Sequence, residues 1–339
     1  MDNIALSICI PTKNFGPYIR ATLDGILSQR MPELEVVIVD GGSTDQTKCI
    51  VEDLASKHSC IRYVRKEMAS GVDRDLRTAI GMARGRYCWL MSADDAPKPG
   101  AMRRVLREIE SGYDTYICNR TECDLGLSPL RERFWLRKTV GDRVVDFGKP
   151  DQIARYFKQS VSLGAVFSYI SSVIFAREFW DDIEAEEGGR LEGSNYQHAF
   201  LLLKALSSGG CHKYIHEQLV YCRGGNDSFL QPGDQGVTRR YLIDLDGYLA
   251  IASALSYPPS VQRPFLRILR REHPWYMWIR VAVRLEQDEE WRAVARKLRG
   301  AGYRRSQLFL LSLIRRMERV LPVVEMTRRV RRLLRFVPN

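Results

Sequence analysis

The stretch RYCWLMSADD, residues 86–95, decides how the rest of the chain is interpreted. An almost unbroken apolar run at 87–91 leads into two adjacent carboxylates, Asp94 and Asp95. Such a run is typical of a central strand that is buried on both faces of a parallel sheet. In open α/β sheets, ligands bind at the carboxyl ends of the strands, where paired acids can hold a hard divalent cation against a phosphate. The alternative is that the two acids cap a helix expected at 99–110.

The chain before this stretch alternates between strand and helix patterns with short connections. Ser43 or Thr44 is expected to cap the second helix. This alternation predicts a doubly wound, mostly parallel α/β sheet over residues 1–118. The strands are expected at 5–10, 35–39 and 61–64, and the helices at 18–29, at 46–56 and from the Gly-led segment 70–75 to residue 83.

After residue 118 the alternation becomes less regular. The apolar segment 161–175 fits a strand or a helix equally well. We expect a catalytic α/β domain over 1–230 and a basic helical region over 231–339. The remaining elements are a strand outside the parallel unit at 143–147, a helix at 198–206, a strand at 214–222, and helices at 241–254, at 261–298 with breaks at Pro264 and Pro274, and at 306–336 with a break at Pro322.

Composition is ordinary for a globular protein, with 45% hydrophobic and 27% charged residues in 339. No secretory leader is apparent, and no apolar run approaches the ~18–20 residues that span a bilayer. The eight cysteines form no CxxC pair, so we expect reduced, mostly buried thiols in a cytoplasmic protein. The absence of GxGxxG after the first strand and of GxxxxGK[ST] argues against a dinucleotide fold and a P-loop.

Several loops that follow predicted strands carry residues suited to ligand binding. Asp40 and Gly41 end the second strand, where glycine allows close backbone approach and the acid can accept hydrogen bonds from a ribose or base. An ordinary capped turn is the competing interpretation. Asp73 at the next helix start favours the helix dipole, whereas Arg74 can reach a phosphate or sugar hydroxyl. Arg223, with the Gly-Gly-Asn-Asp-Ser turn behind it, suits a pyrophosphate or metal, or is a tight turn only.

A general base is harder to assign from the sequence. His198 is a candidate because the unperturbed pKa of histidine is ~6.5. Glu192, Asp181 and Asp182 compete for the same role. The alternative for His198 is a structural histidine whose ring is satisfied inside the core.

Four motifs in order resemble the family 2 glycosyltransferases of the GT-A fold. They are PTKN at 11–14, VDGGSTD at 39–45, SADD at 92–95 and, more weakly, YCRGGNDSF at 221–229. The segment GVDRDLRTAIGMARGRYCWLMSADD also resembles the abequosyltransferase-like subgroup, which uses nucleotide-activated dideoxyhexoses in O-antigen assembly. The resemblance is strong over about residues 4–120 and weaker over 160–230.

The resemblance implies roles for individual positions. Asp94 and Asp95 would hold Mg²⁺ or Mn²⁺ against the donor diphosphate. Ser92 stands where the usual motif has its first acid, so the metal would also rely on Asn226 and Asp227. Asp95, His198 and Glu192 are the catalytic candidates. Together with the residue arguments above, the donor site is expected at Pro11, Thr12, Asn14, Asp40, Gly41, Asp73, Arg74, Asp94 and Arg223.

The expected function is transfer of a sugar, such as the dideoxyhexose abequose, from a CDP-, UDP-, GDP- or dTDP-linked donor. The acceptor implied is a lipid-linked glycan of O-antigen or another surface polysaccharide. The alternative is a non-catalytic protein that keeps the fold and binds nucleotide or anionic membrane, which the serine at position 92 favours. A nucleotidyltransferase is less favoured by the motifs at the strand ends.

The basic character of the chain is concentrated at its end. The net charge is +11, and residues 301–339 contain ten arginines and two glutamates, a net +8. QLFLLSLI at 307–314 precedes Arg315 and Arg316, and 328–336 again mixes arginine with apolar residues. This pattern favours amphipathic helices on the anionic inner face of the cytoplasmic membrane. Packing on the catalytic domain with a solvated arginine face is the alternative; nucleic acid is not expected, because aromatic residues are not interleaved.

Overall fold

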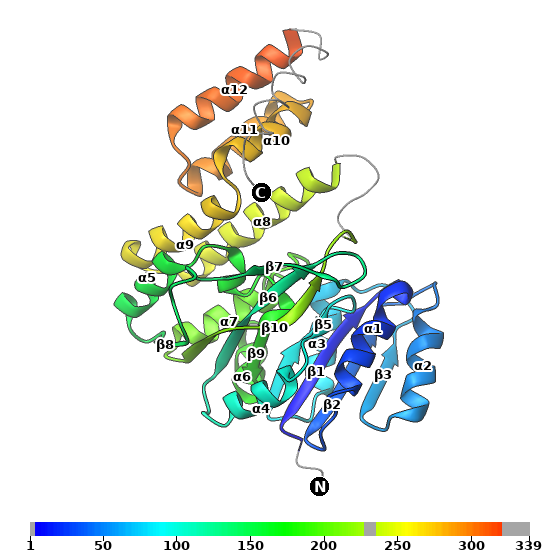
Figure 1. The fold of residues 1–339 in the computed structure, drawn as a ribbon. Coiled ribbons are helices and arrows are strands. Elements are labelled where there is room, and N and C mark those ends of the chain that lie inside the picture. The colour runs from blue at the N-terminus through cyan, green and yellow to red at the C-terminus, as the bar shows by residue number, and fades with distance from the viewer. Residues whose placement is uncertain (1–3, 227–234, 321–339) are drawn as a thin grey trace.

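The computed structural model describes residues 4–226 and 235–320, and one ten-stranded sheet forms the centre of its α/β part (Figure 1). Its first half is parallel, in the order β3-β2-β1-β4. The strands of this half are β1 (Leu6–Thr12), β2 (Leu34–Asp40), β3 (Ile61–Arg65) and β4 (Tyr87–Leu90). The predicted doubly wound α/β sheet is therefore confirmed, and strand ends differ from the expected ones by one or two residues.

Both faces of this half are covered, which explains the nearly continuous apolar strands. Ile8 and Ile10 of β1 lie in one buried cluster with helix α1, whereas Cys9 lies in the other cluster with helix α3. Alternate side chains of a strand point to opposite faces, so each face needs its own helical layer. The helices of these units are α1 (Gly16–Leu27), α2 (Thr47–Lys57), α3 (Val72–Met82) and α4 (Ala101–Ile109).

The second half of the sheet is mixed. Strand β9 runs antiparallel between β4 and β6, and β10 runs parallel to β6. The expected strand near 143 is β8, which lies outside the parallel unit and pairs antiparallel with β10. The strands are β5 (Ala96–Pro97), β6 (Thr115–Cys123), β7 (Pro129–Arg133), β8 (Arg143–Asp146), β9 (Val173–Ala176) and β10 (Cys211–Arg223).

Helices and short 3₁₀ turns connect these strands. The ambiguous segment 161–175 becomes two 3₁₀ turns followed by β9, so it is neither one strand nor one helix. The connecting elements are α5 (Pro150–Gln159), η1 (Leu163–Val166), η2 (Ile170–Ser172), α6 (Arg177–Glu187) and α7 (Gln197–Ser207).

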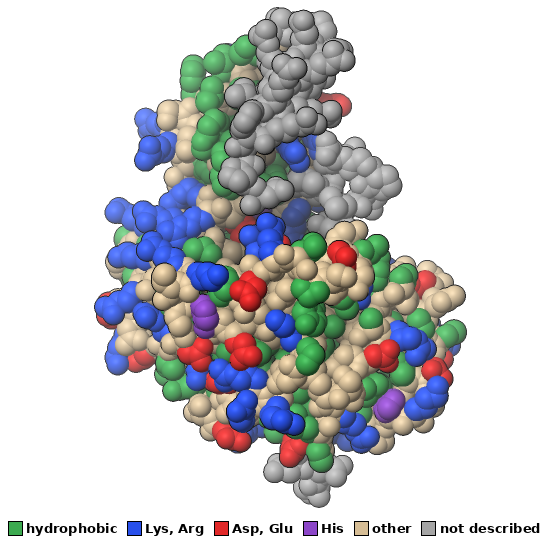
Figure 2. Space-filling view, in the orientation of Figure 1, with side chains coloured by type: hydrophobic (Ala, Val, Ile, Leu, Met, Phe, Trp, Pro, Cys, Tyr) green, Lys and Arg blue, Asp and Glu red, His purple; other side chains and the backbone are tan. Residues whose placement is uncertain are grey.

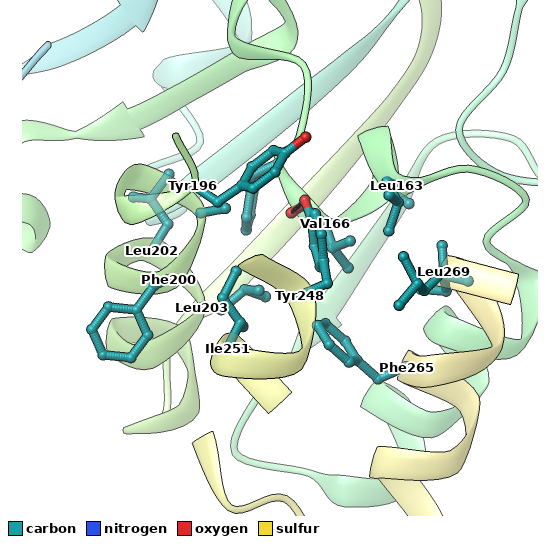
Figure 3. Close-up of a cluster of buried hydrophobic side chains, with 14 of the residues drawn as sticks. Leu163, Val166, Tyr196, Phe200, Leu202, Leu203, Tyr248, Ile251, Phe265 and Leu269 are labelled. Atoms are coloured by element: carbon teal, nitrogen blue, oxygen red, sulfur yellow. Dashed lines mark hydrogen bonds between the residues drawn. The ribbon is translucent and has the colours of Figure 1, made fainter. Parts of the chain in front are cut away.

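The C-terminal part is helical, as expected. Figure 3 shows side chains of α8 and α9 packed against α7 and η1, and Tyr248 Oη donates to the carbonyl of Val166 at 3.0 Å. Helices α10 to α12 form a further layer beyond α8 and α9 (Figure 1). The division at residue 230 stays a prediction. The helices are α8 (Gln235–Leu255), α9 (Pro259–Glu272), η3 (Trp275–Met277), α10 (Trp278–Arg284), α11 (Asp288–Gly300) and α12 (Arg305–Val320).

Two local expectations are wrong. Neither Ser43 nor Thr44 caps α2; Asp45 Oδ1 accepts from the backbone N–H of Thr47 at 3.0 Å. Pro264 does not break a helix, because α9 runs through it. The missing N–H of Pro264 removes only one bond near the helix start, which the helix tolerates. The expected break at Pro322 lies outside the described residues.

The structure bears on two expectations from the sequence, one about membrane-spanning segments and one about the cysteines. Within residues 4–226 and 235–320, no helix combines the length and the apolar content that a bilayer crossing requires. All eight cysteines are free, and Cys9, Cys88, Cys118 and Cys123 are buried.

A buried histidine links β10 to the helical layer. His212 is fully buried; its Nδ1 lies 2.8 Å from Thr115 Oγ1 and its Nε2 lies 3.1 Å from Tyr156 Oη. Tyr156 Oη donates to the carbonyl of Ala165, so it accepts from His212 Nε2. Burial lowers the pKa of His212 to about 3, which keeps the ring neutral, so Nδ1 can accept from Thr115 Oγ1.

Replacing His212 with glutamine should reduce the loss of folding stability at acidic pH. The folded-state pKa lies below the unfolded value of 6.5. The unfolded chain therefore binds the extra proton, and wild-type stability falls as pH drops from about 6.5 towards 3, by at most about 1.4 kcal/mol per pH unit. Urea unfolding at pH 7 and pH 4.5 measures this. Equal losses for wild type and His212→Gln would contradict the assignment.

Candidate active site

The carboxylate of Asp95 joins two distant parts of the chain to the loop after β4. Its Oδ2 accepts from Tyr169 Oη and from Ser171 Oγ, both at 2.6 Å. Its Oδ1 accepts from the backbone N–H of Arg223 at 3.0 Å. Only 3% of Asp95 is exposed, and burial, followed by the charge of Asp94, raises the pKa of Asp95 to about 7. Asp95 therefore fixes η2 and the end of β10 to the loop after β4.

Asp94 faces the other way and is half-buried. Its Oδ1 accepts from Ser92 Oγ, and its Oδ2 accepts from Asn226 Nδ2 at 2.5 Å. Ser92, which replaces the expected first acid of the motif, thus orients the carboxylate next to it. Asp227 lies outside the described residues.

Arg223 closes this edge of the sheet. Its Nε donates to the carbonyl of Asp94 at 2.9 Å, and its guanidinium lies 5.0 Å from the centre of the Tyr18 ring. The guanidinium also donates to the carbonyl of Leu125. The interpretation of the acid pair as helix caps is wrong, since α4 begins after Gly100 without a side-chain cap.

The ends of β1 and β2 form a second group of expected donor residues. Pro11 and Thr12 end β1 beside Val39 and Asp40 of β2. Thr12 Oγ1 is buried and has no hydrogen-bond partner among the described residues. Asn14 follows with a positive φ of 59° and bridges to the next loop, because its Oδ1 accepts from the N–H of Thr44 at 2.8 Å.

Asp40 organises the loop that it begins. It is fully buried, and its Oδ1 accepts from the N–H of Ser43 at 2.7 Å. Its Oδ2 accepts from Tyr63 Oη at 2.8 Å and lies 3.9 Å from Arg65 Nε. Burial, followed by the bond to Asp40, raises the pKa of Tyr63, so the phenol stays protonated. Contact of Asp40 with a base or ribose stays a prediction.

Gly41 is positioned tightly behind Asp40. A Cβ at Gly41 would lie 2.6 Å from Asp75 Oδ2. Asp75 is itself buried and pairs with Lys66 Nζ at 2.8 Å and with Ser70 Oγ at 2.6 Å. The glycine is therefore required by close packing at this strand end.

The start of α3 meets the loop before α7. Asp73 is buried, and its Oδ2 accepts from the N–H groups of Gly193 and Asn195 at 2.8 and 3.0 Å. Its Oδ1 has no partner among the described residues, and burial raises the pKa of Asp73. Arg74 is exposed and pairs with Glu192, which also binds Arg77 Nη1 at 3.0 Å.

His198 lies inside the molecule. It is 3% exposed, its Nε2 donates to the carbonyl of Phe167 at 2.9 Å, and its buried Nδ1 has no partner among the described residues. Burial lowers the pKa of His198, which keeps the ring neutral. These contacts resemble those of a structural histidine, and a catalytic role stays a prediction.

Sequence reasoning missed three residues at this edge. Tyr169 and Ser171 hold Asp95, and Arg120 stacks over the Tyr169 ring at 4.3 Å and the Trp135 ring at 5.1 Å. Arg120 Nε is buried without a partner among the described residues. Arg120 lies in β6, Ser171 lies in η2 and Tyr169 directly precedes η2, in the part of the chain where the alternation of elements fails. The only signal in the sequence is the polar pattern NRTE at 119–122.

The donor set fits a hard divalent cation. A half-exposed carboxylate at Asp94, an amide at Asn226 and the buried carboxylate of Asp95 are oxygen ligands of the kind that Mg²⁺ and Mn²⁺ prefer. Within the described residues no group of three or more His, Cys, Asp or Glu forms a metal cluster. Such a cation would therefore need oxygen atoms from the donor diphosphate as well.

Comparison with known proteins identifies the class. The model of the family described as Glycosyl transferase family 2 matches residues 7–161. Abequosyltransferase RfbV of Salmonella typhimurium is 33% identical over 293 residues, which cover 84% of this chain and 86% of that protein. Chondroitin synthase of Escherichia coli is 33% identical over 118 residues, covering 34% of this chain and 17% of that protein.

Solved structures share the fold. The structure of Staphylococcus aureus TarS 1–349 in complex with UDP has a TM-score of 0.62 at 18% identity, covering 88% of this chain and 81% of that one. Mannosyltransferase PcManGT from Pyrobaculum calidifontis, in complex with GDP-Man and Mn²⁺, has a TM-score of 0.52 at 16% identity, covering 91% and 86%.

The fold is that of a GT-A glycosyltransferase. This chain belongs to glycosyl transferase family 2, and within that family it resembles the abequosyltransferases. The expected family and fold are thereby confirmed.

Gly41→Ala should damage the site, whereas Gly81→Ala should not. The new methyl group at position 41 would displace the buried Asp75 from Lys66, and we expect a loss of about 1–3 kcal/mol in stability together with weaker nucleotide binding. Gly81 lies in α3 with open space around its Cβ position, so alanine there should be neutral or stabilise by up to about 1 kcal/mol. Thermal unfolding with and without UDP measures both. Equal behaviour of the two variants would refute the packing argument.

Proposed function

We propose that this glycosyltransferase moves a dideoxyhexose of the abequose type from a nucleoside-diphosphate donor to a lipid-linked glycan in surface polysaccharide synthesis. The observation that carries the proposal is the convergence of Asp94, Arg223 and Asn226 at one sheet edge, in a chain similar to an abequosyltransferase over most of its length. Structures of similar fold hold UDP, UDP-GlcNAc or GDP-Man, which supports a nucleotide-sugar donor.

The two acids would have different roles in donor binding. Both oxygens of Asp95 already accept hydrogen bonds, and the side chain is buried. Asp94 is the more accessible acid, and Asn226 lies against it. Asp94 and Asn226 would therefore contact the cation, and Asp95 would hold their loop in place. Bound Mg²⁺ or Mn²⁺ would neutralise charge on the leaving diphosphate, which is worth several kcal/mol in such reactions.

Other residues of the chain would bind the nucleotide part of the donor. Thr12 Oγ1 is a buried hydroxyl without a partner among the described residues, so it can bond a donor hydroxyl or phosphate oxygen. Asp40 keeps the neighbouring loop in shape through Ser43 and Tyr63. Arg223 lies beside Asp94, where its positive charge would favour a diphosphate.

Among the three catalytic candidates, Glu192 suits the role of base best. A base must touch the acceptor hydroxyl, and the acceptor arrives from solvent. His198 and Asp95 are each only 3% exposed, whereas the Glu192 side chain is 25% exposed. Arg74 and Arg77 pair with the Glu192 carboxylate and hold it in one position.

Donor binding should protect the wild-type enzyme against thermal unfolding, and Asp94→Asn should abolish the manganese-dependent part. CDP-, UDP-, GDP- and dTDP-sugars are screened with Mn²⁺ and with EDTA; a ligand at a hundredfold excess over its Kd adds about 2.7 kcal/mol. Asp151→Asn, an exposed acid in the first turn of α5, is the matched control. If Asp94→Asn is protected like wild type, Asp94 does not contribute to metal or donor binding.

Glu192→Gln should lower kcat by about 10²–10⁴-fold while leaving donor protection intact, since glutamine keeps the shape but cannot take a proton. Transfer of the sugar to the acceptor is measured under saturating donor. Glu187→Gln is the matched control, because Glu187 is also partly buried and paired with Arg190 and Lys204. A normal rate for Glu192→Gln, or a comparable loss for Glu187→Gln, would exclude Glu192 as the base.

A further inference from the structure

Helix α12 has an apolar stripe on its outer side. Phe309, Leu313 and Met317 repeat at intervals of four and therefore lie on one face, and Leu310 lies beside them. Phe309 is 70% exposed and Leu313 is 42% exposed. Of eleven exposed large hydrophobic residues in the described part of the chain, these four fall within nine positions. So dense a group of exposed apolar side chains marks an interaction surface.

The stripe is not the face that attaches the helix to the protein. Leu311 and Arg315 of the same helix are buried. Arg315 donates to the carbonyl of Ala282 at 2.8 Å and to that of Glu286 at 3.1 Å, at the end of α10. At 100° per residue, positions 311 and 315 lie opposite 309 and 313. The core contacts thus fix the rotation of α12 and direct the stripe outward.

A basic hollow lies at the N-terminal end of α12. It has a volume of about 510 Å³ and is lined, among others, by Arg267, Arg270, Trp275, Tyr303, Arg304 and Gln307. Figure 2 shows Lys and Arg side chains gathered at the edge of the molecule over α9 and α5, below the apolar surface of α12. The hollow lies at the start of α12, because Arg304 and Gln307 are among its lining residues and the apolar stripe begins two positions after Gln307.

The arginines of the hollow lack acidic partners. Within residues 4–226 and 238–318, no carboxylate forms an ion pair with Arg267, Arg270 or Arg304. Among the described residues, Arg270 donates to the carbonyl of Ala301. Burial lowers the pKa of Arg270, and the neighbouring charge of Arg267 acts in the same direction. Three guanidinium groups without counter-ions, next to an indole, suit a phosphate group.

We propose that the hollow binds the phosphate of an anionic phospholipid while the α12 stripe enters the apolar layer of the same membrane. The proposal specifies the membrane contact on which a lipid-linked acceptor would depend, and it therefore rests on the proposed function. A phosphate beside an apolar layer is the chemistry of a phospholipid leaflet. Arg304, the last arginine of the hollow, precedes the apolar side chains of α12 by five to thirteen positions, which matches that order.

A tryptophan and a tyrosine support this orientation. Trp275 lines the hollow, and Tyr276 follows it in the short turn η3; both are only partly buried. Such side chains are enriched at the boundary between headgroups and hydrocarbon, because one end is apolar and the other forms hydrogen bonds. The first turns of α12 would then lie at headgroup level.

Sedimentation of the full-length enzyme with vesicles tests the site. Vesicles of phosphatidylcholine alone are compared with vesicles that also contain phosphatidylglycerol. Wild type should bind the second kind more tightly. Arg267→Gln/Arg304→Gln should weaken that binding by about tenfold or more, since each basic residue near an anionic surface contributes. Phe309→Ser/Leu313→Ser should weaken it to a similar extent through lost insertion.

The matched control is Arg103→Gln/Arg107→Gln. These arginines are exposed on α4, and their removal changes net charge by the same two units. This variant should bind the acidic vesicles like wild type. Vesicle binding that falls equally in the α4 variant, or that survives in the Arg267/Arg304 variant, overturns the proposal. Survival of vesicle binding in the Arg267/Arg304 variant is also the result expected if residues 321–339 alone attach the protein to the membrane.

Two further measurements separate other occupants. Inorganic phosphate that protects wild type but not Arg267→Gln/Arg304→Gln from unfolding, without any preference for acidic vesicles, would make the hollow a site for soluble phosphate and overturn the phospholipid assignment. Light scattering that shows a dimer lost in Phe309→Ser/Leu313→Ser, without vesicle binding, would assign the stripe to a second copy and also overturn it.

Failure of the proposed function is distinguishable from failure of this site. The Arg267/Arg304 and Phe309/Leu313 variants should keep full protection by the nucleotide-sugar donor and wild-type rates of donor hydrolysis, because their substitutions lie in α9 and α12. Loss of vesicle binding with intact donor chemistry supports the docking site. If wild type does not bind the nucleotide-sugar donor, the proposed function is wrong. The vesicle experiment then still tests the docking site independently.

Discussion

The fold around the active edge depends on one buried carboxylate. Asp95 accepts hydrogen bonds from Tyr169, Ser171 and the backbone of Arg223, residues 74 to 128 positions away in the chain. A buried carboxylate without such donors would be destabilised by several kcal/mol, so the three donors and the acid are needed together. Because β10 is the strand that also pairs with β6, β5 and β8, fixing its end beside β4 sets the shape of the whole mixed half of the sheet. The site is therefore assembled by long-range contacts and not by the local turn after β4.

The SADD sequence has one acid fewer than the motif that the family resemblance implies, and its two acids have different surroundings. The oxygens of Asp95 are occupied by its structural contacts, and burial, followed by the charge of Asp94, raises its pKa to about 7. Asp94 keeps a half-exposed carboxylate that Ser92 and Asn226 hold from two sides. A hydroxyl at position 92 supplies an orienting hydrogen bond where an acid would add a second charge close to Asp94. The serine therefore avoids the repulsion that a further carboxylate would bring to this position.

The sequence predicts the parallel half of the fold well, because buried strands and amphipathic helices carry their own periodicity. It predicts β8 and the C-terminal helices for the same reason. It fails where tertiary contacts decide. The segment at 161–175 has no regular hydrophobic period, and contacts with neighbouring residues decide the conformations of η1, η2 and β9. Gly164 of η1, for example, packs closely against Trp135. The acid pair was recognisable as a motif, but the partners of Asp95 come from η2 and β10, which no local pattern connects to β4. Arg120 is missed for the same reason: its stacking on Tyr169 depends on strands that meet only in the folded sheet.

The C-terminal helices combine two arginine roles that sequence reasoning treated as one. Arg315 and Arg316 were grouped as the basic flank of an amphipathic helix, yet Arg315 is buried and holds the end of α10, whereas Arg316 is exposed. A guanidinium has five N–H donors and can bond several of the free carbonyls at a helix end. Its positive charge also complements the negative end of the helix dipole there. Once Arg315 has fixed the rotation of α12, Phe309 and Leu313 have no freedom to turn inward. Full burial of such side chains is worth about 1.5–3 kcal/mol each, so stability of the isolated chain does not account for their position. The core directs the stripe outward, and nearby arginines have no acidic partner among the described residues. A partner surface explains this arrangement better than the fold does.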